Sequence, residues 1–169
     1  MKRRVEKAMG IREMTAGTGM ASAATLEHRI TKINSLYKLE ILIDLAGLEC
    51  GGSNNDIIGG SGLANCHFGQ ILAGKVGTIR GGFMVCLEAP AGGDPDINVY
   101  SATESTGVED ALITGLTETA LCNSGDLSAG SVIGFTANPA ANEYLYLACG
   151  TTTAATYTTG IIVITFYGT

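Results

Sequence analysis

The chain has 169 residues, of which 46% are hydrophobic, and a formal net charge of −6. That length is one domain's worth and is enough to bury a core, and the apolar content is too high for a disordered chain. No window approaches the roughly 20 apolar residues that span a bilayer, and the start of the chain lacks the continuous apolar core of a secretory signal. We therefore expect a soluble protein with no membrane partner.

Charge is divided unevenly along the chain. Residues 1–38 contain eight of the ten Lys and Arg side chains against three acids, whereas residues 39–169 contain two against thirteen. An acidic body lacks the clustered basic side chains of a nucleic-acid groove, so no nucleic-acid partner is expected. We interpret residues 1–36 as a basic N-terminal arm, which either contacts a partner or is simply solvated. Its candidate partner-binding residues are Lys2, Arg3, Arg4, Lys7, Arg12, Arg29 and Lys32.

The first clear strand signal follows this arm and starts at Tyr37. Over residues 37–48 apolar side chains alternate with polar ones. Such alternation puts one face of a strand on a core and the other toward solvent. The side chains expected on the core face are those of Tyr37, Leu39, Ile41, Ile43 and Leu45.

Weaker strand signals occupy the middle of the chain, first at residues 70–72 and 78–88. In the second segment the pair Gly81-Gly82 predicts a bulge or bend. The residues of that segment expected to share one face are Ile79, Phe83, Val85 and Leu87. Residues 107–116 fit either a helical turn or a strand. Further short strands are expected within 97–102, 119–125 and 131–137.

The strongest strand signals lie near the C-terminus, at residues 142–150 and 160–169, where aromatic and β-branched residues dominate. We expect these two strands to form an antiparallel pair in the core of one sheet, joined by residues 151–159. Many short strands with frequent turns and no alternating helices indicate an all-β protein. The predicted fold is a β-sandwich, jelly-roll-like (Greek-key), with an extended N-terminal arm of residues 1–36 before a domain of residues 37–169.

The cysteines are five in number and widely spaced, with no CxxC pair. An odd, irregular set argues against both a disulfide framework and a zinc ribbon. Free cysteines are commonly buried as small hydrophobic residues, and Cys86 and Cys149 lie inside apolar runs that suit this role. The pattern indicates assembly in a reducing cytoplasm.

The residues for catalysis are few. The only histidines are His28 and His67, and His67 directly follows Cys66, so that on a strand their side chains point to opposite faces. Neither histidine is therefore expected to act as the base of a catalytic nucleophile. The sequence also contains no phosphate-binding loop and no zinc-protease motif. A glycosidase needs two acids, and Asp44, Glu88 and Glu143 are candidates for such a pair. The chain has no tryptophan, however, to stack on a sugar. We expect neither an enzyme nor a bound cofactor.

Residues 86–105, CLEAPAGGDPDINVYSATES, contain four carboxylates and no basic residue. Asp94, Asp96 and Asn98 match the first ligands of a calcium loop, but Val99 replaces the required glycine and Ser105 replaces the closing glutamate. Asp94 and Asp96 remain the only metal candidates, as part of a looser site. A strand, a Gly-Gly-Asp-Pro turn and a second strand explain the stretch better, so no metal site is assigned.

Several segments together resemble small virion proteins of tailed phages, of a type frequent in marine phages. The resemblance spans roughly residues 28–169. It rests on ILIDLAGL (41–48), NDIIGG (55–60), CLEAPAGGDPDINVYSATESTGVED (86–110), LTETAL (116–121) and ANEYLYLACGTTTAATYTTGIIVITFYGT (141–169). Residues 1–20 depart from that pattern as an unusual extension.

The resemblance implies a capsid decoration (cement) protein, made in the host cytoplasm and located on the capsid exterior of the virion. It also implies a homotrimer that binds the outside of the major capsid protein lattice and stabilises the head. The basic arm is then expected to lie on an acidic capsid surface. The alternative is a virion-borne receptor- or glycan-binding β module, in a head fibre or a tail component, whose aromatic residues would be Tyr100, Tyr144, Tyr146, Tyr157 and Tyr167.

Overall fold

A computed structural model of the protein describes residues 14–151 and 154–169. Within these ranges the secondary structure is almost entirely β, and the α-helices α1 (Thr18–Ala21) and α2 (Ala73–Val76) are single turns. The predicted all-β fold is confirmed. Five of the arm residues proposed to bind a partner lie outside the described residues, namely Lys2, Arg3, Arg4, Lys7 and Arg12.

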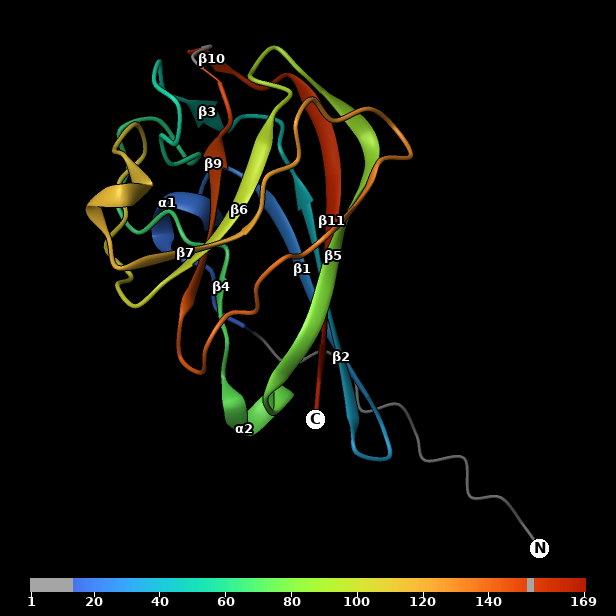
Figure 1. Ribbon diagram of the computed structural model, residues 1–169. Coiled ribbons are helices and arrows are strands. Elements are labelled where there is room, and N and C mark those ends of the chain that lie inside the picture. The colour runs from blue at the N-terminus through green and yellow to red at the C-terminus, as the bar shows by residue number, and fades with distance from the viewer. Residues whose placement is uncertain (1–13, 152–153) are drawn as a thin grey trace, which may run out of the picture.

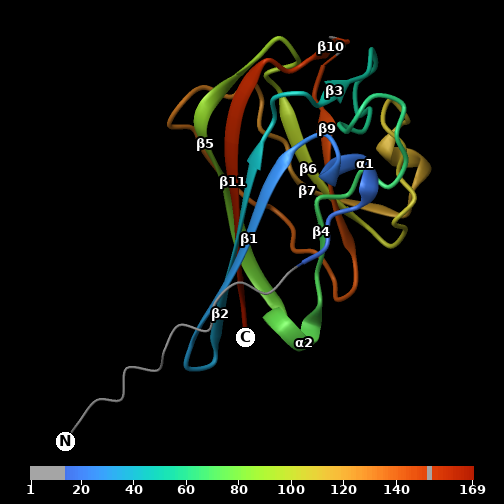
Figure 2. The same ribbon diagram turned by 180° about the vertical axis from the view of Figure 1, so that it is seen from behind.

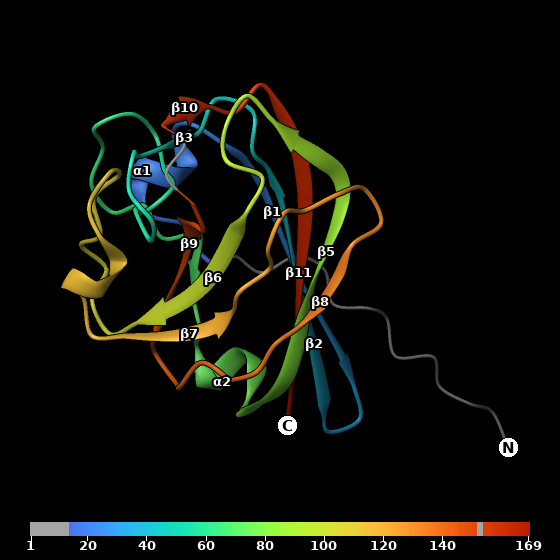
Figure 3. The same cartoon turned by 45° about the horizontal axis from the view of Figure 1, so that its top comes forward.

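The strands form two antiparallel sheets that face each other as a β-sandwich (Figures 1 and 3). The large sheet has the strand order β1-β2-β11-β5-β8 and the small sheet the order β4-β9-β6-β7, while β3 pairs with β10. The jelly-roll-like (Greek-key) description of this topology stays a prediction. The strands are β1 (Thr25–Ile33), β2 (Leu36–Asp44), β3 (Glu49–Cys50), β4 (Gly69–Gln70), β5 (Ile79–Ala91), β6 (Ile97–Ala102), β7 (Glu118–Cys122), β8 (Val132–Gly134), β9 (Tyr144–Cys149), β10 (Ala155–Thr156) and β11 (Thr159–Gly168).

The core lies between the two sheets. Ile41 of β2 pairs with Ile164 of β11 in the large sheet, Val99 of β6 pairs with Leu147 of β9 in the small sheet, and all four are fully buried. The core face predicted for residues 37–48 is confirmed at four of its five positions, since Leu39, Ile41, Ile43 and Leu45 are at most 1% exposed.

The predicted arm boundary at residue 36 is wrong, because residues 25–33 form β1, an edge strand of the large sheet. β1 pairs with β2 from Thr25 opposite Asp44 to Ile33 opposite Leu36. The alternation of a strand is present here in the sequence. Leu26, His28 and Ile30 alternate with charged or polar residues, and the structure leaves these three half-buried and the residues between them exposed. Arg29 and Lys32 therefore lie on a strand and not in an arm.

The face predicted for β5 is also wrong. Met84 and Cys86 are fully buried, whereas Leu87 is 55% exposed. The cause is the predicted irregularity itself: Tyr167 lies opposite Gly81 but Gly168 lies opposite Ile79, so β5 contains one extra residue there. A bulge reverses which side chains face the core, so that Ile79 shares the inner face with Met84 rather than with Phe83.

The two strong C-terminal strands do not pair with each other. β9 lies inside the small sheet and β11 at the centre of the large sheet, so residues 151–159 carry the chain from one sheet to the other. The strand, turn and strand predicted for 86–105 are confirmed as β5 and β6, and this turn crosses between the sheets as well. Residues 107–116 include a 3₁₀ turn at Ile113–Gly115.

Candidate functional site

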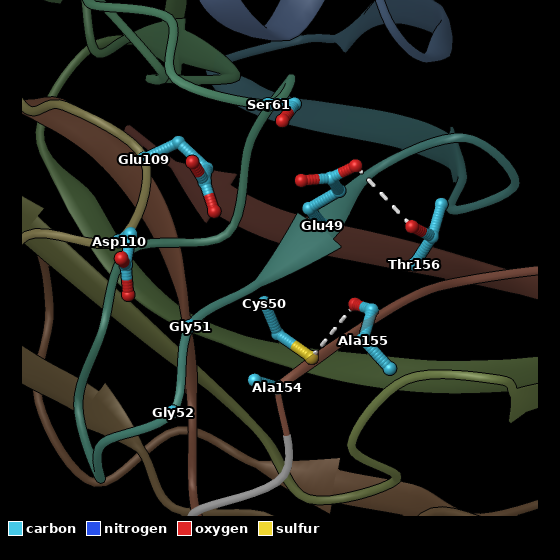
Figure 4. A pocket seen from close by; sticks show the side chains of 10 residues that line it. All are labelled: Glu49, Cys50, Gly51, Gly52, Ser61, Glu109, Asp110, Ala154, Ala155 and Thr156. Atoms are coloured by element: carbon cyan, nitrogen blue, oxygen red, sulfur yellow. Dashed lines mark hydrogen bonds between the residues drawn. The ribbon is translucent and has the colours of Figure 1, made fainter.

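A depression of about 390 Å³ lies beside the β3–β10 pair, and we call it the acid-lined pocket (Figure 4). Three separate stretches of chain build it: β3 with the loop that follows, the turn at residues 109–110, and β10 with the residue before it. Its lining residues are Glu49, Cys50, Gly51, Gly52, Ser61, Glu109, Asp110, Ala154, Ala155 and Thr156. None of them is basic.

Glu109 is the most buried carboxylate of the lining. It is 9% exposed, and its Oε2 accepts a hydrogen bond from the Gly62 amide at 2.8 Å. Burial raises the pKa of Glu109, and the negative charges of Asp110, Glu49 and Asp56 raise it further. The carboxylates of the pocket therefore repel one another, which disfavours anionic ligands.

Asp56 is not itself a lining residue, but it lies against Gly51, which is one. Its side chain is buried, with 2% exposed. Its Oδ2 accepts a hydrogen bond from the Ser53 amide at 2.7 Å. Burial raises the pKa of Asp56, and the neighbouring Asp110 adds to this effect. Both carboxylates reach the backbone at Gly51, where a Cβ atom would overlap them. In the described part of the chain, no group of three or more His, Cys, Asp or Glu side chains is placed to hold a metal ion.

Cys50 forms the floor of the pocket. Its thiol donates a hydrogen bond to the Ala155 carbonyl at 3.2 Å (Figure 4). Its sulfur accepts a hydrogen bond from the Asp94 amide at 3.4 Å. All five cysteines are free and buried, as the sequence predicts.

Asp94, one of the two weak metal candidates, is fully buried. Its Oδ1 accepts a hydrogen bond from the Asp96 amide at 3.0 Å. Its Oδ2 accepts two more, from the Thr151 amide at 2.8 Å and from the Thr151 hydroxyl at 2.6 Å. Both oxygens are therefore used to hold the turn after β5 against the end of β9. Burial raises the pKa of Asp96, and the charges of Asp94 and Asp126 raise it further.

The two histidines lie away from the pocket lining. His28 of β1 reaches across to the Phe68 carbonyl, with 2.8 Å between Nε2 and the oxygen. His67 is 7% exposed, and its ring meets that of Tyr144 edge-on at 4.8 Å. Burial lowers the pKa of both histidines, which favours their neutral forms.

The acids considered as catalytic pairs are not brought together as pairs. Asp44 and Glu88 both lie opposite Ile161, on either side of β11, so a whole strand separates them. The Glu143 carboxylate accepts hydrogen bonds from the Ser101 hydroxyl and the Ala140 amide at 2.7 and 2.8 Å. It thereby fixes a turn next to β9.

A second candidate site is the outer face of the large sheet, which points away from the small sheet. Leu42, Val163, Val85 and Val132 lie side by side across β2, β11, β5 and β8, and we call them the outer apolar row. Val132 is 64% exposed. Next to the row, the rings of Phe83 and Tyr167 are 6.3 Å apart. Such an apolar strip is typical of a surface that a partner covers.

The β1–β2 hairpin extends past the small sheet (Figures 1 and 2). Its tip exposes Ile33 and Leu36, by 64% and 40%. The two described arm candidates lie on its outer strand, where Lys32 stacks over the Tyr37 ring at 4.7 Å and Arg29 lies opposite Glu40. The hairpin therefore combines exposed apolar and basic side chains.

Sequence reasoning missed both sites. Glu49 and Glu109 are 60 residues apart in the chain, and no local spacing connects them. The outer apolar row depends on which side chains of β5 face outward, which the bulge changes. In the described residues no helix is both long and apolar enough to cross a membrane. Comparison with protein-family models, with curated proteins and with solved structures finds no match.

Proposed function

We propose that this protein is a non-enzymatic virion structural protein. In this proposal it is a capsid decoration (cement) protein, made in the host cytoplasm, that binds the outside of the major capsid protein lattice as a homotrimer and stabilises the head. The observation that carries the proposal is the outer apolar row, because an apolar strip on the surface of a sheet is typical of a surface that a protein partner covers. The segment resemblance to tailed-phage virion proteins supports the choice of that partner.

The energetics suit a subunit present in many copies. Covering apolar surface contributes about 25 cal/mol for each Å² removed from water. Val132 and Leu87 are 64% and 55% exposed, so a flat partner can cover both without rearranging the core. Contacts that are individually weak give strong binding when a trimer engages several lattice positions together.

Two of the basic residues predicted to bind the partner now belong to a strand and not to an arm. Arg29 and Lys32 lie on β1, the edge strand of the large sheet. Arg29 is opposite Glu40, on the same face as Leu42 of the outer apolar row, whereas Lys32 is opposite Tyr37, on the other face. Charged side chains on an edge discourage open-ended strand pairing, and Arg29 also adds positive charge beside an apolar surface. An acidic capsid surface would match that combination. The proposal retains Lys2, Arg3, Arg4, Lys7 and Arg12 as further contacts.

A receptor- or glycan-binding role has less support. Such sites usually stack exposed aromatic rings on a sugar. Tyr146 and Tyr157 are 0% and 1% exposed. Their hydroxyls donate to the main-chain oxygens of Glu104 and Asp94, both at 2.8 Å. These two tyrosines hold the fold together and are not free to stack on a ligand.

The test is sedimentation with purified phage shells that lack the protein. Val132→Asp places a charge in the outer apolar row, and we expect it to weaken shell binding by about tenfold or more with an unchanged melting temperature. Thr119→Asp, at an exposed position on β7 of the small sheet, is the matched control and should bind as the wild type does. Equal binding of both variants contradicts the proposed surface. Failure of the wild type to bind shells contradicts the function.

A further inference from the structure

β1 forms one edge of the large sheet, and its outer side is open. The strand covers nine residues, Thr25–Ile33, at the margin of the sheet (Figure 2). Within residues 14–151 and 154–169, the main chain of β1 is hydrogen-bonded to no strand other than β2. An open edge of this length is a template on which another chain can pair.

The turn between β1 and β2 determines which main-chain groups face the open edge. Asn34 and Ser35 form a two-residue turn, with Ile33 opposite Leu36. The closing pair of such a hairpin is hydrogen-bonded, and hydrogen-bonded pairs then alternate along the ladder. Odd-numbered residues of β1 therefore bond to β2, and even-numbered residues point their main-chain N–H and C=O groups outward. The outward set is Leu26, His28, Ile30 and Lys32.

The outward groups of two copies of β1 can meet only in certain antiparallel registers. Outward groups face outward groups when a two-fold axis passes where a residue lies opposite its own copy. With the axis at His28, Glu27 lies opposite Arg29 of the second copy. With the axis one residue away in either direction, Glu27 faces Glu27 or Arg29 faces Arg29, and like charges directly opposite each other are destabilising. Charge therefore favours the register centred on His28.

The side chains are complementary in the register centred on His28. Glu27 and Arg29 are exposed, and symmetry forms their pair twice. This pair is of the non-hydrogen-bonded kind, in which side chains approach most closely. Thr25 lies opposite Thr31. Burial lowers the pKa of His28, so the two histidines at the axis meet without charge.

An apolar depression of about 460 Å³ adjoins the inner face of the same edge. Leu26 and His28 of β1 line it, together with Met14 and Ala24 among others. In the register centred on His28, Ile30 of the second copy lies opposite Leu26 and thus beside this depression. Apolar side chains of the two copies then cover each other, which adds to the contribution of the charge pairs.

We propose that two copies of this chain pair antiparallel through β1, about a two-fold axis at His28, and so join their five-stranded sheets into one continuous sheet. The proposal is independent of the virion role proposed above. Each copy uses up its open β1 edge, so the pairing closes at two copies and does not extend into a fibre. A three-fold contact elsewhere on the surface leaves β1 free, and the β1 pair then links one trimer to the next.

The pair also places the outer faces of the two large sheets on the same side. Side chains of directly opposite residues point to one face of a sheet, so Glu27 and Arg29 of both copies stay on the outer face. The outer apolar rows of the two copies therefore belong to one surface, with the charge pairs between them.

Sedimentation velocity of the full-length protein over a range of concentrations tests the pair. A single strand pair is a small interface, so we expect the sedimenting mass to double between about 1 μM and about 1 mM. Glu27→Arg and Arg29→Glu should each weaken the association by about tenfold or more, because each places like charges opposite each other twice. Glu88→Arg makes the same charge change at an exposed position on β5 and should associate as the wild type does.

An equimolar mixture of Glu27→Arg and Arg29→Glu separates pairing from any defect in folding. In a mixed pair the introduced arginine faces the introduced glutamate, and a native Glu27 faces a native Arg29. We expect the mixture to associate within about threefold of the wild type. Misfolding of either variant is not corrected by mixing, so recovery in the mixture supports direct contact between these positions.

Thr25→Cys and Thr31→Cys test the register. The two positions lie opposite each other in a non-hydrogen-bonded pair, where the Cβ atoms come close enough for a disulfide bond. The five native cysteines are buried, so they do not compete for the new thiols. Mild oxidation of a mixture should therefore link position 25 of one copy to position 31 of the other, whereas either variant alone should remain largely unlinked.

A sedimenting mass that stays constant over the whole concentration range would overturn the proposal. So would a mixture of the two charge variants that associates no better than each variant alone. Cross-linking of Thr25→Cys to itself would overturn the register centred on His28. Shell binding by a protein that never pairs would overturn the β1 contact and leave the virion role intact.

Discussion

Tyr157 donates a hydrogen bond from its hydroxyl to the main-chain oxygen of Asp94 at 2.8 Å. Tyr157 lies between β10 and β11 and is 1% exposed, whereas Asp94 lies in the turn from β5 to β6 and is fully buried. These are two of the places where the chain crosses from one sheet to the other. One buried hydroxyl therefore joins two crossings that are distant in sequence.

Tyr157→Phe tests this contact. The change leaves the Asp94 carbonyl buried without its partner, and we expect it to lower the free energy of unfolding by about 1–3 kcal/mol. Urea unfolding at pH 7 measures the difference. Tyr167→Phe, on the partly exposed outer face of β11, is the control and should change stability by less than about 0.5 kcal/mol. Equal small effects at both positions would show that the bond contributes little.

Asp94→Ala should cost more than Tyr157→Phe, because it removes all three hydrogen bonds that the buried carboxylate accepts from Asp96 and Thr151. We expect a loss of about 3 kcal/mol or more in urea unfolding, since the amides are left without acceptors. Asp126→Ala removes an exposed acid from the same region and should stay close to the wild type. A loss at Asp94 below about 1 kcal/mol would contradict the structural role.

Calcium should leave the protein unchanged. Both Asp94 oxygens already accept hydrogen bonds from the chain, so a cation would have to break those bonds in order to bind. We expect the melting temperature to be the same in millimolar calcium and after chelation. A saturable rise with calcium that disappears in Asp96→Asn would revive the metal interpretation of this turn.

The strands could be predicted from the sequence wherever alternation is regular, and their placement could not. Alternation at Leu39, Ile41 and Ile43 identifies β2 and its core face correctly. The same kind of signal identifies β9 and β11, but it says nothing about which sheet each strand joins. Pairing depends on contacts between distant residues, such as Ile162 opposite Cys86, which periodicity does not report.

The acid-lined pocket could not be predicted from the sequence for a similar reason, because it is formed by residues that are far apart in the chain. Beside the acid-lined pocket, the carboxylates of Asp110 and Asp56 converge on Gly51, where the absence of a side chain leaves room for them. The sequence does predict the parts of the molecule that depend on neighbours in the chain. The Gly-Gly-Asp-Pro turn is one of them, and the buried, free state of Cys86 and Cys149 is another.

The β5 bulge makes a sharp prediction, because it decides which side chains face the core. Met84 is fully buried and Leu87 is 55% exposed. Met84→Ala should therefore destabilise the protein by about 2–5 kcal/mol, through lost burial and a cavity. Leu87→Ala should change the free energy of unfolding by less than about 0.5 kcal/mol. Urea unfolding of the two variants measures both values, and the opposite order would restore the core face that the sequence predicted for this strand.

The crowded acids of the pocket should make stability depend on pH in an unusual direction. The folded pKa values of Asp56 and Glu109 are raised, first by burial and then by acidic neighbours that include Asp110. Both groups therefore bind protons more tightly in the folded protein than in the unfolded chain. Their contribution to stability is complete below the unfolded pKa values of about 3.9 and 4.3. It is lost as the pH rises through the raised folded values.

Asp110→Asn removes the shared repulsion with little strain, since Asp110 has a φ of 64° and asparagine accepts that left-handed conformation. We expect the variant to be more stable than the wild type by up to about 1 kcal/mol at pH 7. The difference should shrink toward zero as the pH falls to about 4, where Asp56 and Glu109 bind protons in both proteins. Urea unfolding across this range measures the trend, with Glu27→Gln, an exposed acid on β1, as the control. A gain that is the same at both ends of the range would mean that repulsion between these carboxylates is not its cause.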